Sequence, residues 1–139
     1  MALRVLLAAD SRLVQRSVRD VLASAGLILL DTASDHDDAL RLAAAHHPDV
    51  LVVDDHIDDV SGIELARTVR RMLPDLPIIL LSTVASGHQI TAAFAAGILG
   101  YVVKTDVAFH LLRAICDVTC ATTFVSPCAS RVVCDAYLP

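Results

Sequence analysis

Four residues that could carry out chemistry each stand at the C-terminal end of an apolar run. They are Asp10, Asp54, Ser82 and Lys104. In open α/β folds, ligands bind at the edge of the sheet where the C-terminal ends of the parallel strands meet. Two carboxylates, a hydroxyl and an ammonium at that edge could hold a divalent cation and a phosphoryl group. The pattern therefore predicts a phosphoryl-handling site.

Length and composition fit a single domain with an aliphatic core. The chain has 139 residues, of which 55% are hydrophobic and 4% aromatic, and this length is near the usual domain size. No apolar run reaches the roughly 18 residues that cross a bilayer, and the short apolar start does not resemble a signal peptide. The formal net charge of −5 argues against binding to a nucleic-acid backbone. We therefore expect a cytoplasmic domain that binds neither DNA nor membrane by itself.

The four cysteines all fall in the last quarter of the chain, at Cys116, Cys120, Cys128 and Cys134. Their spacing does not match the C-x-x-C pattern of zinc and redox sites, and a lopsided distribution does not suggest a disulfide framework. We expect packed or free thiols.

Five nearly continuous apolar runs predict parallel strands that are buried on both faces. We place them near Arg4–Ala8, Leu27–Thr32, Val50–Asp54, Ile78–Ser82 and Gly100–Val103. Segments with the apolar spacing of helices lie between them, and alternating strands and helices predict a three-layer, doubly wound α/β sandwich. Right-handed crossovers favour the flavodoxin-like (βα)5 arrangement with a parallel sheet of order 2-1-3-4-5.

The expected helices begin at residues that cap helices well. The first is expected to start at Ser11, the second at Ser34 and the fifth after Asp106. The segments Ser61–Glu64 and Ser86–Gln89 match the S-x-x-E/Q capping box, in which each side chain bonds to the backbone of the other residue. These boxes predict the starts of the third and fourth helices.

The order and spacing of Asp10, Asp54, Ser82, Tyr101 and Lys104 resemble the receiver domain of two-component response regulators, over residues 3–126. Three segments resemble the NarL/FixJ (LuxR-type) branch: Leu81-Ser82-Thr83, Ala96-Gly97-x-x-Gly100-Tyr101-Val102-Val103-Lys104 and Phe124-Val125-Ser126-Pro127. We therefore expect residues 1–122 to form a receiver domain. Residues 123–139 are expected to be a tail that leads to a DNA-binding domain outside this sequence.

The resemblance implies a role for each residue of the site. Asp54 would be the phosphoacceptor, a carboxylate nucleophile that forms an acyl phosphate. Asp10, Asp54 and the backbone carbonyl of His56 would hold Mg²⁺, which needs few protein oxygens. Lys104 would offset the negative charge of the phosphoryl group.

The resemblance also implies a switch. Ser82 and Thr83 would bind the phosphoryl group, and Ser82 would be drawn toward it. Tyr101 would then turn inward into the vacated space and change the surface formed by the fourth helix and the fifth strand.

The predicted pocket departs from the family pattern. Ala9 stands where a second acid usually ends the first strand, which should weaken Mg²⁺ binding. Ile57-Asp58 replaces the usual Met-Pro pair, and Asp55, Asp58 and Asp59 add negative charge. These acids would either supply a substitute metal contact or repel a phosphodonor. A degenerate receiver, acting as a phosphorylation-independent interaction or ligand-binding module, is therefore the alternative interpretation.

Other patterns are less specific. Asp54-x-His56-x-x-Asp59 resembles the D-x-H-x-x-G pattern of cobalamin-binding domains but lacks the glycine. A phosphatase of the haloacid dehalogenase type needs an aspartate where His56 stands. No G-x-G-x-x-G or P-loop is present, which argues against a nucleotide enzyme. We expect His46 and His47 to satisfy carbonyls at a helix end rather than to bind a metal.

The sequence thus predicts a signalling switch and not an enzyme. The expected partner is a histidine kinase, and the expected output is control of transcription through the DNA-binding domain. The fifth helix carries surplus apolar residues, among them Phe109, Leu112 and Cys116, and surplus apolar surface often marks a partner site. We therefore expect a symmetric homodimer formed through this helix.

Overall fold

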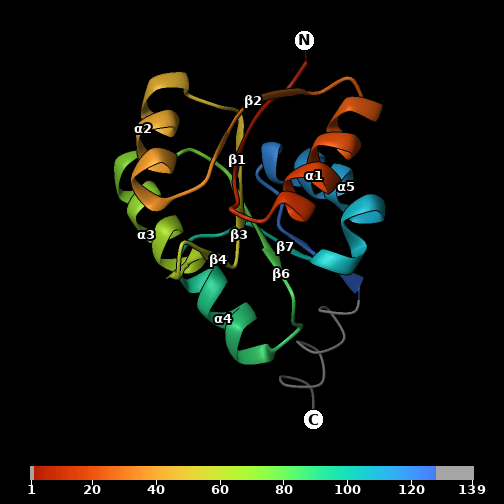
Figure 1. Cartoon of the computed structure of the whole chain (residues 1–139). Coiled ribbons are helices and arrows are strands. Elements are labelled where there is room, and N and C mark those ends of the chain that lie inside the picture. Colours follow the sequence, from red (N-terminus) through yellow and green to blue (C-terminus); the bar gives the residue numbers. More distant parts are fainter. Residues whose placement is uncertain (1, 128–139) are drawn as a thin grey trace.

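A parallel β-sheet runs through the centre of the molecule in the computed structural model, which describes residues 2–127 (Figure 1). Its strands lie in the order β2-β1-β3-β6-β7-β8, and each neighbouring pair is parallel. A short antiparallel hairpin, β4 with β5, follows β3. The bounds are β1 Arg4–Ala8, β2 Ile28–Ala33, β3 Val50–Asp54, β4 His56–Ile57, β5 Val60–Ser61, β6 Ile78–Ser82, β7 Gly100–Val103 and β8 Phe124–Val125.

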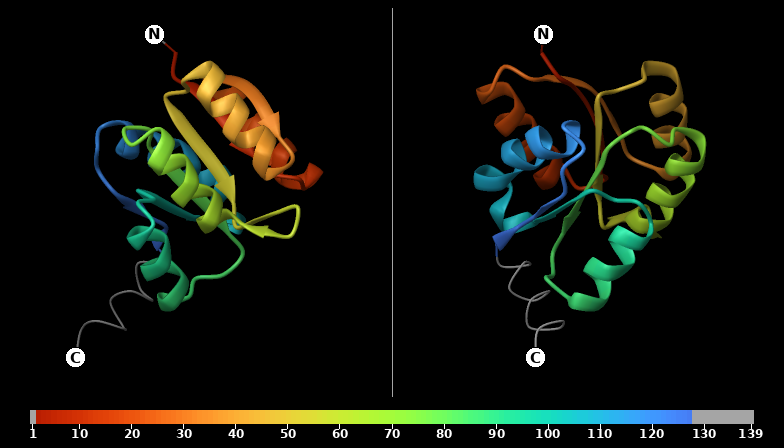
Figure 2. Two further views of the ribbon diagram at one scale, coloured as in Figure 1. Left: turned by 90° about the vertical axis from the view of Figure 1, so that its left-hand side faces the viewer. Right: turned by 180° about the vertical axis from the view of Figure 1, so that it is seen from behind.

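Helices cover both faces of the sheet (Figure 2). The helices α1 Arg12–Ser24 and α5 Val107–Thr119 pack on one face, and α2 His36–His46, α3 Gly62–Met72 and α4 Gly87–Ala95 pack on the other. A 3-10 turn, η1 Lys104–Asp106, joins β7 to α5. Alternate side chains of each strand enter opposite layers, which explains why the strands are apolar along their length. None of the helices within residues 2–127 is long and apolar enough to span a membrane.

The predicted doubly wound fold is confirmed, with the five predicted strands in the predicted order. Four strands have the predicted bounds, and the second lies one residue later, at Ile28–Ala33. The sequence predicts that Phe124 and Val125 belong to the tail, whereas the structure pairs them with β7 as an additional edge strand. A two-residue strand is too short to give an apolar pattern. The predicted tail beyond residue 127, with Cys128 and Cys134, lies outside the described residues.

Side-chain caps explain where the helices begin. Ser11, Ser61 and Ser86 each accept a hydrogen bond from a backbone amide in the first turn, as predicted. The cap of α2 is Asp35 and not the predicted Ser34, because the carboxylate of Asp35 accepts from the amide of Asp38 at 2.7 Å. A carboxylate is also favoured there by the positive end of the helix dipole.

The two capping boxes are only half formed. Glu64 forms an ion pair with Arg67, and the side-chain amide of Gln89 donates to Ser82 Oγ at 3.0 Å. Each side chain therefore bonds to another partner instead of the backbone of its serine. The predicted starts of the two helices are confirmed, because Ser61 and Ser86 cap α3 and α4.

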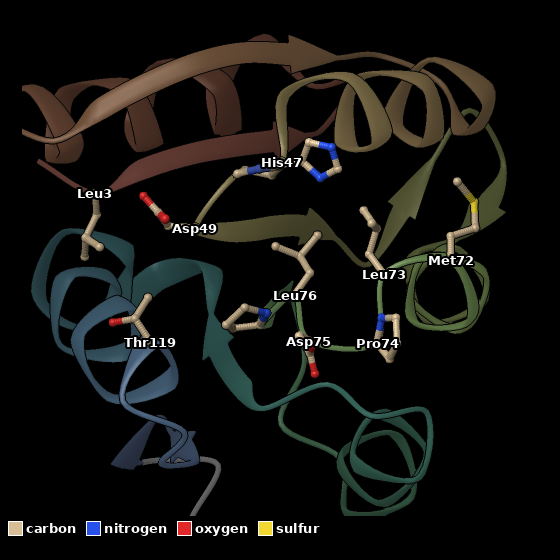
Figure 3. Close-up of a pocket in the computed structure, with 11 residues that line it drawn as sticks. Leu3, His47, Asp49, Met72, Leu73, Pro74, Asp75, Leu76 and Thr119 are labelled. Carbon is tan, nitrogen blue, oxygen red and sulfur yellow. The ribbon is translucent and has the colours of Figure 1, made fainter.

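The N-terminal edge of the sheet holds a cavity of about 550 Å³ (Figure 3). It is lined by segments that precede β1, β3 and β6, including Leu3, Asp49 and Leu76, so it lies at the opposite edge from Asp54. Nearby, the Arg4 guanidinium donates to the carbonyls of His46 at 2.8 Å and His47 at 3.2 Å. An arginine, and not the predicted imidazoles, thus satisfies the end of α2.

Gly62 lets α3 begin directly beside the end of β3, and we predict that Gly62→Ala destabilises the fold. A Cβ atom at this position would lie 2.0 Å from the carbonyl oxygen of Asp54 and 3.0 Å from Val53 Cγ1. The backbone would have to move, so we expect a loss of about 3 kcal/mol in the free energy of unfolding, measured by urea denaturation.

Gly26→Ala is the comparison for this prediction. A Cβ atom at Gly26 meets nothing within 4 Å, and only its φ of +72° is unfavourable for alanine. We expect this variant to lose about 1 kcal/mol. Equal losses in the two variants would contradict the steric explanation for Gly62.

Candidate functional site

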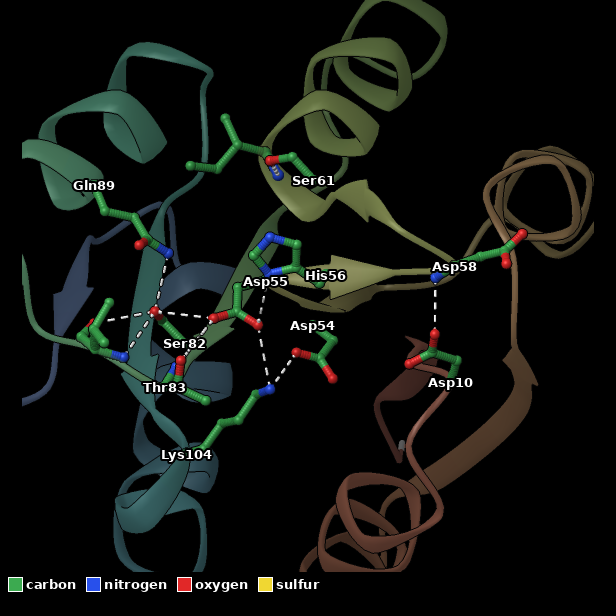
Figure 4. Close-up of polar contacts among 12 residues, drawn as sticks. Asp10, Asp54, Asp55, His56, Asp58, Ser61, Ser82, Thr83, Gln89 and Lys104 are labelled. Atoms are coloured by element: carbon green, nitrogen blue, oxygen red, sulfur yellow. Dashed lines mark hydrogen bonds and ion pairs between the residues drawn. The ribbon is translucent and has the colours of Figure 1, made fainter.

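The C-terminal ends of β3, β6 and β7 bring three predicted site residues into one pocket (Figure 4). Asp54 is the last residue of β3, Ser82 is the last residue of β6, and Lys104 directly follows β7. The strands pair in register, with Asp54 opposite Leu81 and Ser82 opposite Val103. The polar side chains therefore fall at one level of the sheet, which is the convergence expected of parallel strands.

Lys104 joins two buried carboxylates. Its Nζ lies 2.5 Å from Oδ1 of Asp54 and 3.2 Å from Oδ1 of Asp55. The side chain of Asp54 is 2% exposed and that of Asp55 is 8% exposed, whereas 22% of the Lys104 side chain is accessible. Lys104 is also the only lysine of the sequence. Its ammonium is a compact charge that serves both acids at once.

Asp55 is held from several sides. Its Oδ2 accepts hydrogen bonds from the amide of Thr83 at 3.1 Å, from the hydroxyl of Thr83 at 3.2 Å and from the hydroxyl of Ser82 at 3.4 Å. Its backbone amide donates to the carbonyl of Leu81 at 2.9 Å, and its carbonyl accepts from the amide of Gly62 at 2.7 Å. These backbone bonds keep its side chain directed toward the end of β6.

Burial and mutual contact shift the pKa values of the two acids in opposite directions. Burial raises the pKa of Asp54, and its contact with Asp55 adds to this effect, while Lys104 opposes it. Burial alone would also raise the pKa of Asp55, but contacts with Asp54, the Thr83 amide and Lys104 outweigh it and lower this pKa to about 2. Burial would lower the pKa of Lys104, but the two carboxylates raise it. Asp55 is therefore anionic and Lys104 cationic at neutral pH.

Ser82 connects the pocket to α4 and to Tyr101. Its fully buried hydroxyl accepts from Nε2 of Gln89 at 3.0 Å and can donate to the carbonyl of Val84 at 3.0 Å or to Asp55. The same Val84 carbonyl accepts from the hydroxyl of Tyr101 at 2.7 Å. Tyr101 is 0% exposed, and burial raises its pKa, so its hydroxyl stays a donor. Ser82 and Tyr101 thus share one carbonyl acceptor.

Asp10 bonds to the loop that follows β3. Its Oδ2 accepts from the backbone amide of Asp58 at 2.8 Å, and its carboxylate is turned toward that loop (Figure 4). This bond requires a residue other than proline at position 58, because proline has no N–H. Asp58 and Asp59 also have positive φ angles of 50° and 62°, which proline cannot adopt. Replacement of the usual Met-Pro pair therefore gives Asp10 a backbone partner.

The acids of the pocket provide oxygen donors of the kind that Mg²⁺ prefers. Within residues 2–127, no group of three or more His, Cys, Asp or Glu side chains is arranged to hold a metal ion. Mg²⁺ is commonly bound by only one or two carboxylates, together with water. The carboxylates of Asp10 and Asp54 are therefore suitable ligands in type and number. Ala9 is fully buried and adds no carboxylate. The exposed side chain of His56 lies 3.7 Å from Asp55, and its backbone belongs to β4.

Two side chains of the pocket, those of Asp55 and Gln89, have contacts that the sequence does not predict. Asp55 is predicted as one of several loop acids, whereas it is buried against Ser82 and Thr83. The sequence does hold one signal for it, because a residue directly after a buried strand can continue the pairing of that strand. Gln89 is predicted to cap α4 but bonds to Ser82. No pattern in the sequence distinguishes these two partners.

The predicted interface residues lie along α5. Phe109 is 81% exposed, which is the largest exposed fraction among the exposed large hydrophobic residues described. Leu112 is half-buried, and Cys116 is an exposed free thiol, as is Cys120. An apolar strip therefore reaches the surface on this helix.

Comparison with known proteins finds relatives for most of the chain. A model of the response regulator receiver domain matches residues 5–115. The DNA-binding transcriptional activator DevR/DosR of Mycobacterium tuberculosis is 35% identical over 116 residues, which cover 83% of this chain and 54% of that protein. The transcriptional regulatory protein LiaR of Bacillus subtilis is 32% identical over 114 residues, which cover 81% of this chain and 54% of that protein. The chain thus spans about half the length of these relatives.

Solved structures share the fold. A two-component response regulator of the LuxR family from Aurantimonas sp. SI85-9A1 superposes with a TM-score of 0.94 at 24% identity, over 100% of both chains. The signal receiver domain of a NarL response regulator from Mycobacterium tuberculosis superposes with a TM-score of 0.71 at 27% identity, over 82% of this chain and 96% of that chain.

We predict that Lys104→Ala lowers stability but leaves the protein folded. The substitution removes the ammonium between two buried carboxylates, and an unpaired buried charge is costly. Because Lys104 is partly exposed, we expect a loss of about 2 kcal/mol in the free energy of unfolding at neutral pH, measured by urea denaturation. Arg113→Ala is the control, since its ion pair with Asp117 lies at the surface and contributes about 0.5 kcal/mol or less. Equal losses would contradict a compensating role for Lys104.

Proposed function

The chain belongs to the response regulator receiver domain family, and we propose that it is a phosphorylation-dependent switch of a two-component system. The observation that carries this proposal is the pocket at the end of β3, where Asp54 lies 2.5 Å from Lys104. Ser82 and Thr83 close the same pocket (Figure 4). A carboxylate nucleophile, a cation and hydrogen-bond donors are the groups that phosphoryl transfer to an aspartate needs.

Asp54 is the phosphoacceptor in this proposal. Its ionised carboxylate attacks the phosphorus of a phosphohistidine on a partner kinase, or of a small acyl phosphate. A new P–O bond forms while the bond to the leaving group breaks. Lys104 opposes the effect of burial on the pKa of Asp54 and offsets the charge of the phosphoryl oxygens, while Ser82 and Thr83 donate hydrogen bonds to them. The chain is thus a phosphoacceptor and not an enzyme with a separate substrate.

Receiver domains generally bind Mg²⁺ at an acidic pocket, and we propose that Asp10, Asp54 and the backbone carbonyl of His56 hold it here. When bound, the ion supplies positive charge beside the phosphoryl group. Asp10 must share its carboxylate with the amide of Asp58, and Ala9 adds no second acid. We therefore expect weak Mg²⁺ binding.

The proposed output is a changed surface over α4 and β7. Ser82 contacts Gln89 of α4 and the Val84 carbonyl that also binds Tyr101. Movement of Ser82 toward an anion therefore affects both the start of α4 and the position of Tyr101. These contacts support the predicted switch roles of Ser82 and Tyr101.

We propose that this surface controls transcription. DevR/DosR is a DNA-binding transcriptional activator, and this chain covers 54% of its length. The proposal is that the receiver is cytoplasmic and is phosphorylated there by a histidine kinase. It then regulates a DNA-binding domain of the same longer protein.

A second candidate function is that of a degenerate receiver, which binds a partner without phosphorylation. The hydrogen bond from the Asp58 amide to Asp10 favours this function, because it occupies one oxygen of an acid that would bind Mg²⁺. The two functions differ in whether Asp54 accepts a phosphoryl group, so one experiment separates them.

We predict that acetyl phosphate and Mg²⁺ give a single phosphoryl adduct that is lost in Asp54→Asn. Intact-protein mass spectrometry at neutral pH measures the adduct. Asp75→Asn is the matched control, because it makes the same chemical change at an exposed loop residue beside the cavity at the opposite edge of the sheet, and it should keep the adduct. If the unaltered protein forms no adduct over a wide range of Mg²⁺ concentrations, this result would favour the degenerate receiver.

We also propose a symmetric homodimer through α5, and predict that Phe109→Glu gives a folded monomer. Phe109, Leu112 and Cys116 lie three and four residues apart, so they share one side of the helix. Static light scattering should show a monomer where the unaltered protein is dimeric. Met72→Glu is the control, since Met72 is 47% exposed on α3 across the sheet, and it should leave the dimer intact. An unaltered protein that is monomeric at high concentration, with and without acetyl phosphate, would contradict the dimer.

A further inference from the structure

Asp55 is a buried acid that the mechanism above does not use. It is 7% exposed and lies between the end of β6 and Lys104. Its Oδ2 accepts from the hydroxyl of Ser82 and from the amide and hydroxyl of Thr83, at 3.1 to 3.4 Å. Its Oδ1 lies 3.2 Å from the ammonium of Lys104. These are the groups that the proposed function assigns to the phosphoryl oxygens.

The carboxylate of Asp55 therefore already binds the hydrogen-bond donors of the phosphoryl-binding pocket (Figure 4). A hydroxyl, a backbone amide and an ammonium bind an anion through charge-assisted hydrogen bonds. A phosphoryl group on Asp54 needs the same donors, so it must displace the side chain of Asp55 or share them with it. The backbone of Asp55 is held by Leu81 and Gly62, so the displacement is a rotation of the side chain alone.

The switch residues have the arrangement that an anion in the pocket should produce. The hydroxyl of Ser82 faces Asp55, and Tyr101 lies inward with 0% exposure. The Tyr101 hydroxyl donates to the Val84 carbonyl in the loop after β6 at 2.7 Å. The chain itself therefore supplies all the groups of this hydrogen-bond network, including the anion, which is Asp55.

We propose that Asp55 is an internal ligand of the phosphoryl-binding pocket, which holds Ser82 and Tyr101 in the switched arrangement and competes with the phosphoryl group for Ser82, Thr83 and Lys104. This proposal rests on the proposed function of the pocket. It has two consequences. The switched surface is present before phosphoryl transfer, and transfer to Asp54 is slowed because Asp55 must first leave its donors.

The position of Tyr101 tests the first consequence. The sequence has two tyrosines, so Tyr137→Phe leaves Tyr101 as the only site for 3-fluorotyrosine, observed by fluorine NMR. Asp55→Ala, which clears the pocket, should move the Tyr101 resonance toward that of an exposed tyrosine. Addition of Mg²⁺ and beryllofluoride, a phosphoryl analogue, should move it back. If Asp55→Ala fails to fold, Asp55→Asn, which removes only the charge, takes its place. Asp75→Asn is the matched control, and its Tyr101 resonance should not move.

The rate of phosphorylation tests the second consequence. With acetyl phosphate and Mg²⁺, Asp55→Ala and Asp55→Asn should form the Asp54 adduct about tenfold faster than the unaltered protein, the factor expected when a charged hydrogen bond no longer has to break. Asp75→Asn, at the opposite edge of the sheet, should keep the original rate.

The two readouts separate failure of this inference from failure of the proposed function. An unmoved Tyr101 resonance and an unchanged rate in both Asp55 variants would overturn the role of Asp55 and leave phosphorylation of Asp54 standing. No adduct in the unaltered protein or in any variant would overturn the proposed function. In that case, a Tyr101 resonance that moves in Asp55→Ala would still support Asp55 as the group that holds the switch.

Discussion

The burial of Asp54 and Asp55 side by side sets the conditions for the whole pocket. Two anions removed from water next to each other are unfavourable unless a cation and hydrogen bonds compensate them. Lys104 supplies the charge, at 2.5 Å and 3.2 Å from the two acids, and Thr83 supplies hydrogen bonds to Asp55. The acids follow β3, Thr83 follows β6, and Lys104 follows β7. The pocket therefore exists only when these strands are in register.

The two acids have different environments, and this difference separates their roles. The contact with Asp54, the hydrogen bond from the Thr83 amide and the charge of Lys104 lower the pKa of Asp55 to about 2, so it remains an anion bound within the protein. Burial raises the pKa of Asp54, whose main partner in the pocket is Lys104. Adjacent carboxylates in unlike surroundings commonly take different tasks. The proposed roles follow this difference, with Asp55 as the internal ligand of the pocket and Asp54 as the phosphoacceptor.

How far the sequence predicts the structure depends on whether a feature is local. The bounds of β1, β3, β6 and β7 follow from continuous apolar runs, because a strand buried on both faces needs apolar residues throughout. The serine caps are equally local, since each bonds within its own first turn. The two-residue strand β8 is not predicted, because it forms by pairing with β7 and is too short to have an apolar pattern of its own. The caps at Glu64 and Gln89 fail for a related reason, since each side chain has another partner nearby.

The sequence by itself determined the doubly wound fold and the edge of the sheet at which Asp54, Ser82 and Lys104 meet, because parallel strands end on one side. Only the tertiary structure decided that Asp55 takes the donors of Ser82 and Thr83, and that Asp10 accepts from the amide of Asp58. The Asp55 contact with Ser82 joins residues 27 positions apart, and the Asp10 contact joins residues 48 positions apart. Such hydrogen bonds depend on distances between strands and loops, which the order of residue types does not contain.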